Sequence, residues 1–481
     1  MTAGPSAALE GPWPFDPIGD ALGRIRAEFV DDDRGAVADY IPQLSGADPD
    51  AFGLALVGVA GSVHSAGEAH TPFTIQSISK PFTYALALGD IGTEGVLARV
   101  GVEPSGEAFN AISLEPDTGR PSNPMINAGA ILTTSLVAGG GPEERFERIR
   151  TMMSRCAGHE LDVDEDVFRS EHGTGDRNRA LAYLMRHAGS LTMDVESAVD
   201  VYFRQCSVLV TAVDLAMMAA TLANGGVNPR TEEVAINEEV AEQVLTVMAT
   251  CGMYDYSGEW LFRVGLPAKS GVAGGVVAVS PSQFGIGLYS PRLDGRGNSV
   301  HGVAASEAIS QRFSLHLMHQ IDRSAPTFER RTSSAGAVGG AGVAVAADGT
   351  AAGSGAPPDT GIAVLAVQGY LEFAAAERAL LSLRTRAEQE APEALVIDVS
   401  HVTRCHPMAA GLIDSMIELI AGRGVTVVTV DRRHRGLLVS QAEFPTVAEA
   451  LDACRAGTVA DRRPTGSAVL PDPIGETADP G

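Results

Sequence analysis

Apolar residues recur every three or four positions near the start of the chain and again at intervals through its first half. This spacing predicts helices at 17–30 and 79–88. Between them, residues 52–67 contain an apolar run, a Gly-Ser turn and a short alternating run, which predicts a β-hairpin. Residues 142–250 have a mostly helical pattern, with predicted helices at 145–154, 178–185, 195–206, 212–222 and 238–250.

Short apolar runs return after this helical stretch. Runs at 262–264, 274–280 and 284–289 predict strands, and residues 299–318 predict a long closing helix. Because strands occur at both ends of the region and helices between them, we expect one sheet built from both ends with a helical insertion. The large domain should therefore have an α+β fold.

The last hundred residues alternate between strand and helix patterns. The predicted strands are 362–367, 394–399 and 425–430, and the predicted helices are 374–389, 408–420 and 446–455. This alternation is typical of a compact α/β unit.

Two stretches rich in small residues, Pro and Gly divide the chain. Residues 326–359 and 458–481 cannot bury enough apolar surface to offset their conformational entropy, so we expect a flexible linker and a disordered tail. The predicted domains are therefore 15–325 and 360–457.

The composition excludes several classes of function. The 481 residues include 60 acidic and 35 basic ones, a net charge of −25, whereas nucleic-acid and anionic-membrane binders depend on clustered Lys and Arg. The five cysteines form no CxxC pair, which argues against a zinc site or a disulfide framework. The N-terminus shows no secretory pattern, and no apolar run approaches 18 residues. We expect a cytoplasmic protein that binds no metal, nucleic acid or membrane.

Lys80 and Lys269 are the only lysines among the 35 basic residues. Arg replaces Lys in most roles but cannot lose its proton. Ser77 lies three positions before Lys80, so the two share one face of a helix. A serine hydroxyl needs a base to become a nucleophile, and a lysine among apolar neighbours can be that base because burial lowers its pKa.

Lys269 begins a Lys-Ser-Gly segment that precedes an apolar run. Serine enzymes with a Ser-x-x-Lys motif carry a similar Lys-(Ser/Thr)-Gly segment, and the Lys269 ammonium would add positive charge to such a site. Each motif alone is weak, and a surface lysine is the simpler interpretation of each. The only two lysines of the chain, placed in both motifs in this order, predict an active-site serine fold.

The large domain resembles the serine-dependent, β-lactamase-like glutaminases of bacteria over about 16–320. The resemblance rests on matching segments at 37–44, 76–80, 103–106, 123–130, 170–171, 177–179, 202, 205–207, 251–255 and 265–272. It implies hydrolysis of L-glutamine to L-glutamate and ammonia without a cofactor, and a homo-oligomer.

The resemblance also implies roles for the reacting groups. Ser77 would attack the carboxamide, and Lys80 would be its base and then protonate the departing ammonia. Tyr40 and Tyr254 would flank the reacting centre, and the backbone N–H groups of Ser77 and Val272 would form the oxyanion hole.

Four more residues would bind the amino-acid end of the substrate, namely Asn127, Glu171, Asn178 and Tyr202. A carboxylate suits the substrate's ammonium, and amide or phenol donors suit its carboxylate. Simpler interpretations remain: Asn127 as a helix cap, Glu171 as a charge in a helix's first turn, and Tyr202 and Tyr254 as core aromatic residues.

The small domain resembles a STAS domain, the anti-sigma-factor-antagonist type, through residues 394–403, the helix 408–420 and the strand 425–430. It departs from that pattern at 406–408, where His-Pro-Met replaces the usual Asp-Ser-Ser, so phosphorylation of a serine there is not expected. Docking of a protein, dimerisation, sensing of a small ligand and a purely architectural role stay open.

Three functions are thus considered for the whole chain. The first is a glutaminase with a regulatory or docking appendage. The second is another Ser-x-x-Lys hydrolase that acts on a β-lactam or an ester. The third is a STAS-type signalling protein with an inert catalytic domain.

Overall fold

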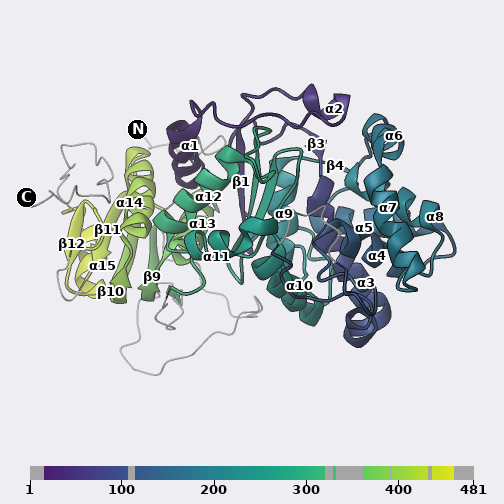
Figure 1. Ribbon diagram of the computed structural model, residues 1–481. Helices are drawn as coiled ribbons and strands as arrows, with labels where there is room; N and C mark the ends of the chain where they lie inside the picture. The colour runs from purple at the N-terminus through teal and green to yellow at the C-terminus, as the bar shows by residue number, and fades with distance from the viewer. Residues whose placement is uncertain are drawn as a thin grey trace, which may run out of the picture. The chain divides into compact units, whose positions relative to one another are not determined.

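The chain forms two units in this computed structural model, one spanning residues 18–319 and a C-terminal unit that begins at residue 320. The structure describes residues 16–106, 114–319, 329–331, 361–389, 392–431 and 436–459. The large unit combines one antiparallel sheet with a helical insertion, as its pattern of strands and helices predicts (Figure 1).

The sheet of the large unit is assembled from both ends of that unit. Its order is β2-β1-β7-β6-β5, so the N-terminal hairpin pairs directly with the last strand of the unit. The strands are β1 (Gly53–Gly58), β2 (Val63–Gly67), β5 (Ala268–Ser270), β6 (Gly275–Ser280) and β7 (Phe284–Tyr289). The strand predicted at 262–264 is wrong, because these residues lie at the end of helix α11 (Ser257–Arg263) and just after it.

Both faces of the sheet are buried. All six residues of β1, of β6 and of β7 are buried. Alternate residues such as Ala55 and Val277 belong to the core shared with the helical insertion. The opposite face is covered by α1 (Pro17–Phe29) and α12 (Val300–Phe313) (Figure 1). Helix α12 is shorter than predicted because Ser314 takes a left-handed backbone conformation and ends it.

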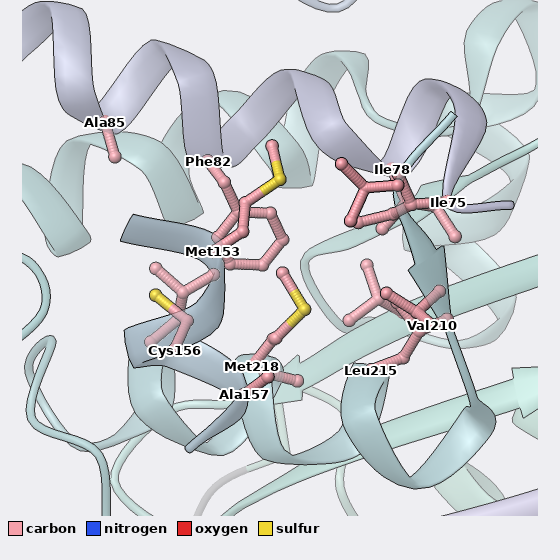
Figure 2. Packing of buried hydrophobic residues seen from close by; sticks show 14 of the residues in the cluster. Ile75, Ile78, Phe82, Ala85, Met153, Cys156, Ala157, Val210, Leu215 and Met218 are labelled. Carbon is pink, nitrogen blue, oxygen red and sulfur yellow. The ribbon is translucent and has the colours of Figure 1, made fainter. Parts of the chain in front are cut away.

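The helical insertion packs around the start of helix α3. Figure 2 shows Phe82 beside Met153, and Ile75 and Ile78 nearer to Val210 and Leu215. The remaining helices before α11 are α2 (Pro42–Ser45), α3 (Ser79–Leu97), α4 (Asn127–Leu136), α5 (Pro142–Ala157), α6 (Glu165–Thr174), α7 (Asp176–His187), α8 (Val195–Cys206), α9 (Ala212–Ala223) and α10 (Glu238–Cys251).

Helix α9 lies against the sheet at unusually close range. A Cβ atom on Gly285 would come within 2.2 Å of the Ala216 carbonyl oxygen, and one on Gly287 within 2.0 Å of the Ala212 carbonyl oxygen. Glycine is therefore required at both positions of β7, because any larger residue would collide with the helix backbone. This packing joins the sheet to the helical insertion.

The C-terminal unit has its own five-stranded sheet. Its order is β12-β11-β10-β9-β8, with β9 to β12 parallel and β8 antiparallel to β9. The strands are β8 (Glu329–Arg331), β9 (Ile362–Leu371), β10 (Ala394–Cys405), β11 (Thr426–Val430) and β12 (Ala442–Phe444), and the helices are α13 (Phe373–Gln389), α14 (Pro407–Gly422) and α15 (Val447–Arg455). The expectation of an α/β unit is confirmed.

Two strands of this unit differ from the sequence-based prediction. Strand β8 lies inside the predicted linker at 326–359, and its three polar residues carry no hydrophobic pattern. Strand β12 is equally short and was not predicted. The rest of that linker and residues 460–481 of the predicted tail lie outside the described residues. No helix in the described part of the chain is long and apolar enough to span a bilayer.

Candidate active site

Ser77 lies in a tight turn that leads into helix α3. Strand β3 (Phe73–Thr74) pairs with β4 (Leu209–Val210) and is soon followed by the 3-10 turn η1 (Gln76–Ile78), which adjoins α3. Gln76 has a φ angle of +50°, in a region that residues other than glycine rarely adopt. Ser77 is 6% exposed and lies near the positive end of the α3 dipole. The turn therefore holds the Ser77 hydroxyl in one place beside the helix.

Lys80 is buried on the first turn of α3, where it is 1% exposed. Its Nζ donates to Asn127 Oδ1 at 2.7 Å and to the Met125 carbonyl at 3.1 Å. Burial lowers the pKa of Lys80 to about 8. A neutral amine has two N–H groups and one lone pair, so these two acceptors leave the lone pair available for a proton.

Tyr254 lies on the sheet side of the site, in the 3-10 turn η2 (Tyr254–Tyr256), with a φ angle of +58°. Its hydroxyl donates to the Ser270 carbonyl at 3.0 Å. Burial raises the pKa of Tyr254 to about 12, and hydrogen bonds with Ser77 and Ser270 oppose that shift. Because the single proton of the phenol points at Ser270, the phenol oxygen can accept a hydrogen bond from the Ser77 hydroxyl.

Lys269 shares the acceptor of Tyr254. Its Nζ donates to the Ser270 carbonyl at 2.7 Å and lies 3.9 Å from the centre of the Tyr254 ring. Burial lowers the pKa of Lys269 well below the usual value for lysine, and the charge of Lys80 adds to the effect. The sequence predicted a positive charge at Lys269, but burial shifts this side chain toward the neutral amine.

Val272 follows strand β5 at the point where the strand meets the Ser77 turn. The preceding Gly271 would place a Cβ atom 3.0 Å from the Ile75 carbonyl oxygen and 3.5 Å from Gln76 Cβ. Glycine therefore allows the backbone at the end of β5 to approach the turn. The approach brings the main chain just before Val272 close to the main chain before Ser77.

Asn127 joins Lys80 to the helical insertion. Besides accepting from Lys80, its Oδ1 lies 3.3 Å from the Tyr202 hydroxyl, and its Nδ2 donates to Asn178 Oδ1 at 3.0 Å. Burial raises the pKa of Tyr202 well above its usual value, so its hydroxyl remains a donor. These side chains come from α4, α7 and α8 and form one polar cluster with Lys80.

Glu171 is a buried carboxylate on α6 that is 8% exposed. Its Oε1 accepts from the Tyr40 hydroxyl at 2.8 Å and from Gln76 Nε2 at 3.4 Å, and both donors are neutral. Burial raises the pKa of Glu171, while these two hydrogen bonds oppose the shift. Tyr40 is 48% exposed as a residue, yet its hydroxyl end reaches this buried carboxylate.

The predicted site residues thus lie in one connected region between the sheet, α3 and the helical insertion. Asn127 contacts Lys80 and Asn178 through its side chain, and Glu171 lies in the second half of α6, so the cap and first-turn interpretations of these two residues are wrong. Sequence reasoning assigned no role to the Met125 carbonyl or the Gln76 side chain. Gln76 stands beside Ser77 in the matching segment, which could have drawn attention to it.

A Ser-x-x-Lys turn between an antiparallel sheet and a helical insertion defines the large unit as a β-lactamase-like enzyme domain. A glutaminase family model matches residues 35–318, and a STAS domain model matches residues 356–437. The chain belongs to the glutaminase family and carries a C-terminal STAS domain, as the sequence resemblance predicts.

Relatives extend the similarity over both units. "Glutaminase" of Trichormus variabilis is 52% identical over 305 residues, which are 63% of this chain and 91% of that relative. "Glutaminase" of Corynebacterium efficiens is 42% identical over 420 residues, which are 86% of this chain and 92% of that relative. The solved structure described as "Crystal Structure Analysis of Mglu in its glutamate form" is 38% identical, with a TM-score of 0.63, and covers 86% of this chain and 98% of that one.

Proposed function

We propose that this glutaminase-family amidohydrolase hydrolyses the side-chain amide of L-glutamine through an acyl-enzyme on Ser77. Neutral Lys80 accepts the Ser77 proton as Oγ bonds to the carboxamide carbon. The backbone N–H groups of Ser77 and Val272 stabilise the tetrahedral oxyanion. Collapse breaks the C–N bond, and Lys80 returns the proton to the departing ammonia.

A water molecule completes the cycle. It attacks the acyl carbon while Lys80 accepts one of its protons, and the second tetrahedral oxyanion collapses to release L-glutamate. The recovered proton returns to Ser77 Oγ, so the enzyme ends as it began. The pKa of Lys80, about 8, suits a group that must give and take a proton in the neutral range.

Glu171 is the observation that supports an amino-acid substrate most strongly. A buried carboxylate is expensive without a positive partner, and its described hydrogen-bond donors, Tyr40 and Gln76, are neutral. The α-ammonium of glutamine would supply the missing charge. Gln76 adjoins Ser77, so the residue that contacts Glu171 also sets the position of the proposed nucleophile.

The remaining polar groups suit the α-carboxylate. Asn178 and Tyr202 both reach Asn127, and all three side chains carry donors that neutral amides and phenols offer to an anion. An ester or a β-lactam without a free α-ammonium would leave Glu171 buried without a positive partner. This difference favours glutamine over the alternative Ser-x-x-Lys substrates.

The direct experiment measures ammonia and L-glutamate released from L-glutamine by the purified full-length protein. We expect turnover by the wild type and loss by a factor of about 10³ or more in Ser77→Ala. Turnover of an ester or a β-lactam in place of glutamine would overturn the substrate assignment. Undiminished activity of Ser77→Ala would overturn the acyl-enzyme.

We also propose a cytoplasmic homo-oligomer whose domains, at 15–325 and 360–457, are joined by the segment 326–359, of which residues 329–331 pair with the C-terminal sheet as β8. The cysteine pattern, without a CxxC pair and with an odd number of cysteines, supports the location, and the family resemblance supports the oligomer. The STAS domain would bind a protein or a small ligand. Its usual Asp-Ser-Ser segment is replaced at His406, whose ring accepts a hydrogen bond from the Met408 amide at the start of α14.

A further inference from the structure

The carbonyl oxygen of Gln76 is bound twice by the same residue. It accepts from the backbone N–H of Ser79 and from Ser79 Oγ, the latter at 2.7 Å. Both bonds act on a backbone whose φ angle is unfavourable for glutamine. The side-chain bond of Ser79 therefore helps to hold a turn that would otherwise relax.

Holding this carbonyl also orients the amide of Ser77. The Gln76 carbonyl and the Ser77 N–H belong to one peptide unit, which is planar and trans, so they point in opposite directions. A rotation of that peptide would turn the Ser77 N–H away from the place where an oxyanion forms. Ser79 never needs to touch the substrate to affect this donor.

A buried amide in turn holds the Ser79 hydroxyl. Gln205 Nε2 donates to Ser79 Oγ at 3.3 Å, and Gln205 Oε1 lies 2.9 Å from Thr134 Oγ1 and 3.1 Å from Thr83 Oγ1. Gln205, Ser79 and Thr134 are completely buried, and Thr83 is 1% exposed. The hydroxyl of Ser79 thus accepts from one neighbour and donates to another, which leaves it one orientation.

This chain of hydrogen bonds links three helices to one peptide. Thr83 comes from α3, Thr134 from α4 and Gln205 from α8. Burying so many polar groups costs free energy unless all of them are satisfied, and an apolar core would pack the same helices. These hydrogen bonds lead to the peptide before Ser77, so the buried polar groups fix that peptide in addition to packing the helices together.

We infer that Ser79 and Gln205 are positioning residues that preorganise the oxyanion hole by fixing the peptide between Gln76 and Ser77. The inference rests on the proposed function, since it assigns the Ser77 N–H as an oxyanion donor. It predicts an effect on the transition state, where the oxyanion exists, and little effect on binding of the ground state.

The test compares Ser79→Ala with the wild type in full-length protein. We expect kcat to fall by roughly 10- to 100-fold, below the full loss of one oxyanion donor, with KM changed by less than about threefold. The affinity for L-glutamate, measured by calorimetry, should stay the same. Ser79→Thr retains the hydroxyl and should restore most of the activity.

A matched control separates positioning from general loss of a buried hydroxyl. Ser306 is completely buried, and its Oγ donates to the Gly302 carbonyl at 2.7 Å within α12, away from the Ser77 turn. Ser306→Ala removes the same chemical group and should leave kcat near the wild-type value. An equal fall of kcat in both variants would overturn the inference.

Gln205 provides a second route to the same peptide. Thr134→Val removes one hydroxyl near Gln205 Oε1 and should lower kcat by a few-fold, while Gln205→Leu should approach the effect of Ser79→Ala if it folds. The pH of the inflection in kcat/KM should not move in these variants, because the contacts of Lys80 are intact. A shifted pH profile would mean that the network acts on the base instead, against the inference.

The proposed function and this inference fail in different ways. Wild-type protein that releases no ammonia, or Ser77→Ala that remains active, removes the first. Normal kcat in Ser79→Ala, beside an active wild type and an inactive Ser77→Ala, removes only the second.

Discussion

The two lysines of the chain lie on opposite sides of one site, and their surroundings differ. Lys80, on the helix side, donates to an amide oxygen and a backbone carbonyl. Lys269, on the sheet side, donates to one carbonyl and faces a tyrosine ring. Both are completely or almost completely buried, so burial alone cannot explain a difference between them.

Burial lowers the pKa of both lysines, and the charge of Lys80 adds to the shift at Lys269. The pKa of Lys80 is about 8, and the pKa of Lys269 lies well below the usual value for lysine. Lys80 is thus poised to exchange protons, and Lys269 is shifted toward the neutral amine next to Tyr254. Neither role is open to arginine, which stays charged.

The largest effect is expected from Lys80→Arg. Its guanidinium cannot accept the Ser77 proton, so we expect kcat to fall toward the upper end of the roughly 10²- to 10⁴-fold range for loss of a general base. Ammonia release measures the loss. Lys80→Met, which is uncharged and of similar length, should be equally inactive, and a cooperative thermal transition in both variants would show that they fold.

Near-normal turnover by Lys80→Arg would show that Lys80 is not the base. The base would then have to be another group, and Lys269 is the nearest buried amine on the opposite side of Tyr254.

A smaller effect is expected at Lys269. Lys269→Arg places a permanent charge in a site that favours a neutral amine, and we expect kcat/KM to fall by about 10²-fold, as for displacement of neighbouring catalytic groups. Lys269→Met keeps the site uncharged and should retain more activity than the arginine variant. The reverse order would show that Lys269 acts through its positive charge.

Sequence reasoning predicted the sheet well where both of its faces are buried. The strand at 284–289 and the helix at 195–206 have the predicted bounds, because continuous apolar burial and helical spacing leave few alternatives. The strand predicted at 262–264 failed because Phe262 and Val264 have high β-propensity, yet Phe262 is 83% exposed on a helix.

The site was predictable only as far as side-chain chemistry shows in a sequence. Ser77 and Lys80 stand out through their spacing and through the rarity of lysine. The Met125 carbonyl could not be found this way, since every residue has a carbonyl and only the fold selects one. Gln205 lies in the matching segment 205–207, but its role could not be predicted, because a buried glutamine in a helix has the same sequence pattern as an exposed one.

The helix side should control the pH dependence of activity. Below a pH of about 8 Lys80 is protonated and cannot act as a base, so kcat/KM should rise with pH to an inflection near 8. Asn127→Asp places a carboxylate at 2.7 Å from Lys80 Nζ in place of an amide, which favours the ammonium. We expect the inflection to move upward by about 1–3 pH units, measured as kcat/KM against pH.

The same shift affects stability with a definite sign. Between about pH 8 and 10.5 the unfolded chain binds a proton at Lys80 that the folded chain has lost, so the free energy of unfolding should rise with pH in this window. Lys80→Met should lose the contribution of Lys80 to that rise and keep the contribution of Lys269, whose pKa is also lowered. An inflection of kcat/KM that stays in place in Asn127→Asp would mean that another group sets it.

The smallest effect on activity is expected behind the sheet-side lysine. Ser270 Oγ donates to Asn298 Oδ1 at 2.6 Å, and Nδ2 of this fully buried asparagine has no hydrogen-bond partner among the described residues. Ser270→Ala keeps the carbonyl that Lys269 and Tyr254 share, so kcat/KM should fall by less than about tenfold, which corresponds to about 1.4 kcal/mol.

Stability should respond more than activity, because Ser270→Ala leaves both ends of the buried Asn298 amide unpaired. We expect the free energy of unfolding to fall by about 1–3 kcal/mol, measured by denaturant titration. Adding Asn298→Leu removes the orphaned amide and should recover part of that loss, since replacing both partners by apolar groups is nearly neutral. A double variant that is less stable than Ser270→Ala, with kcat/KM reduced 10²-fold, would contradict this expectation. Asn298 would then help to position Lys269, and the surroundings of the two lysines would be more alike than their hydrogen-bond acceptors indicate.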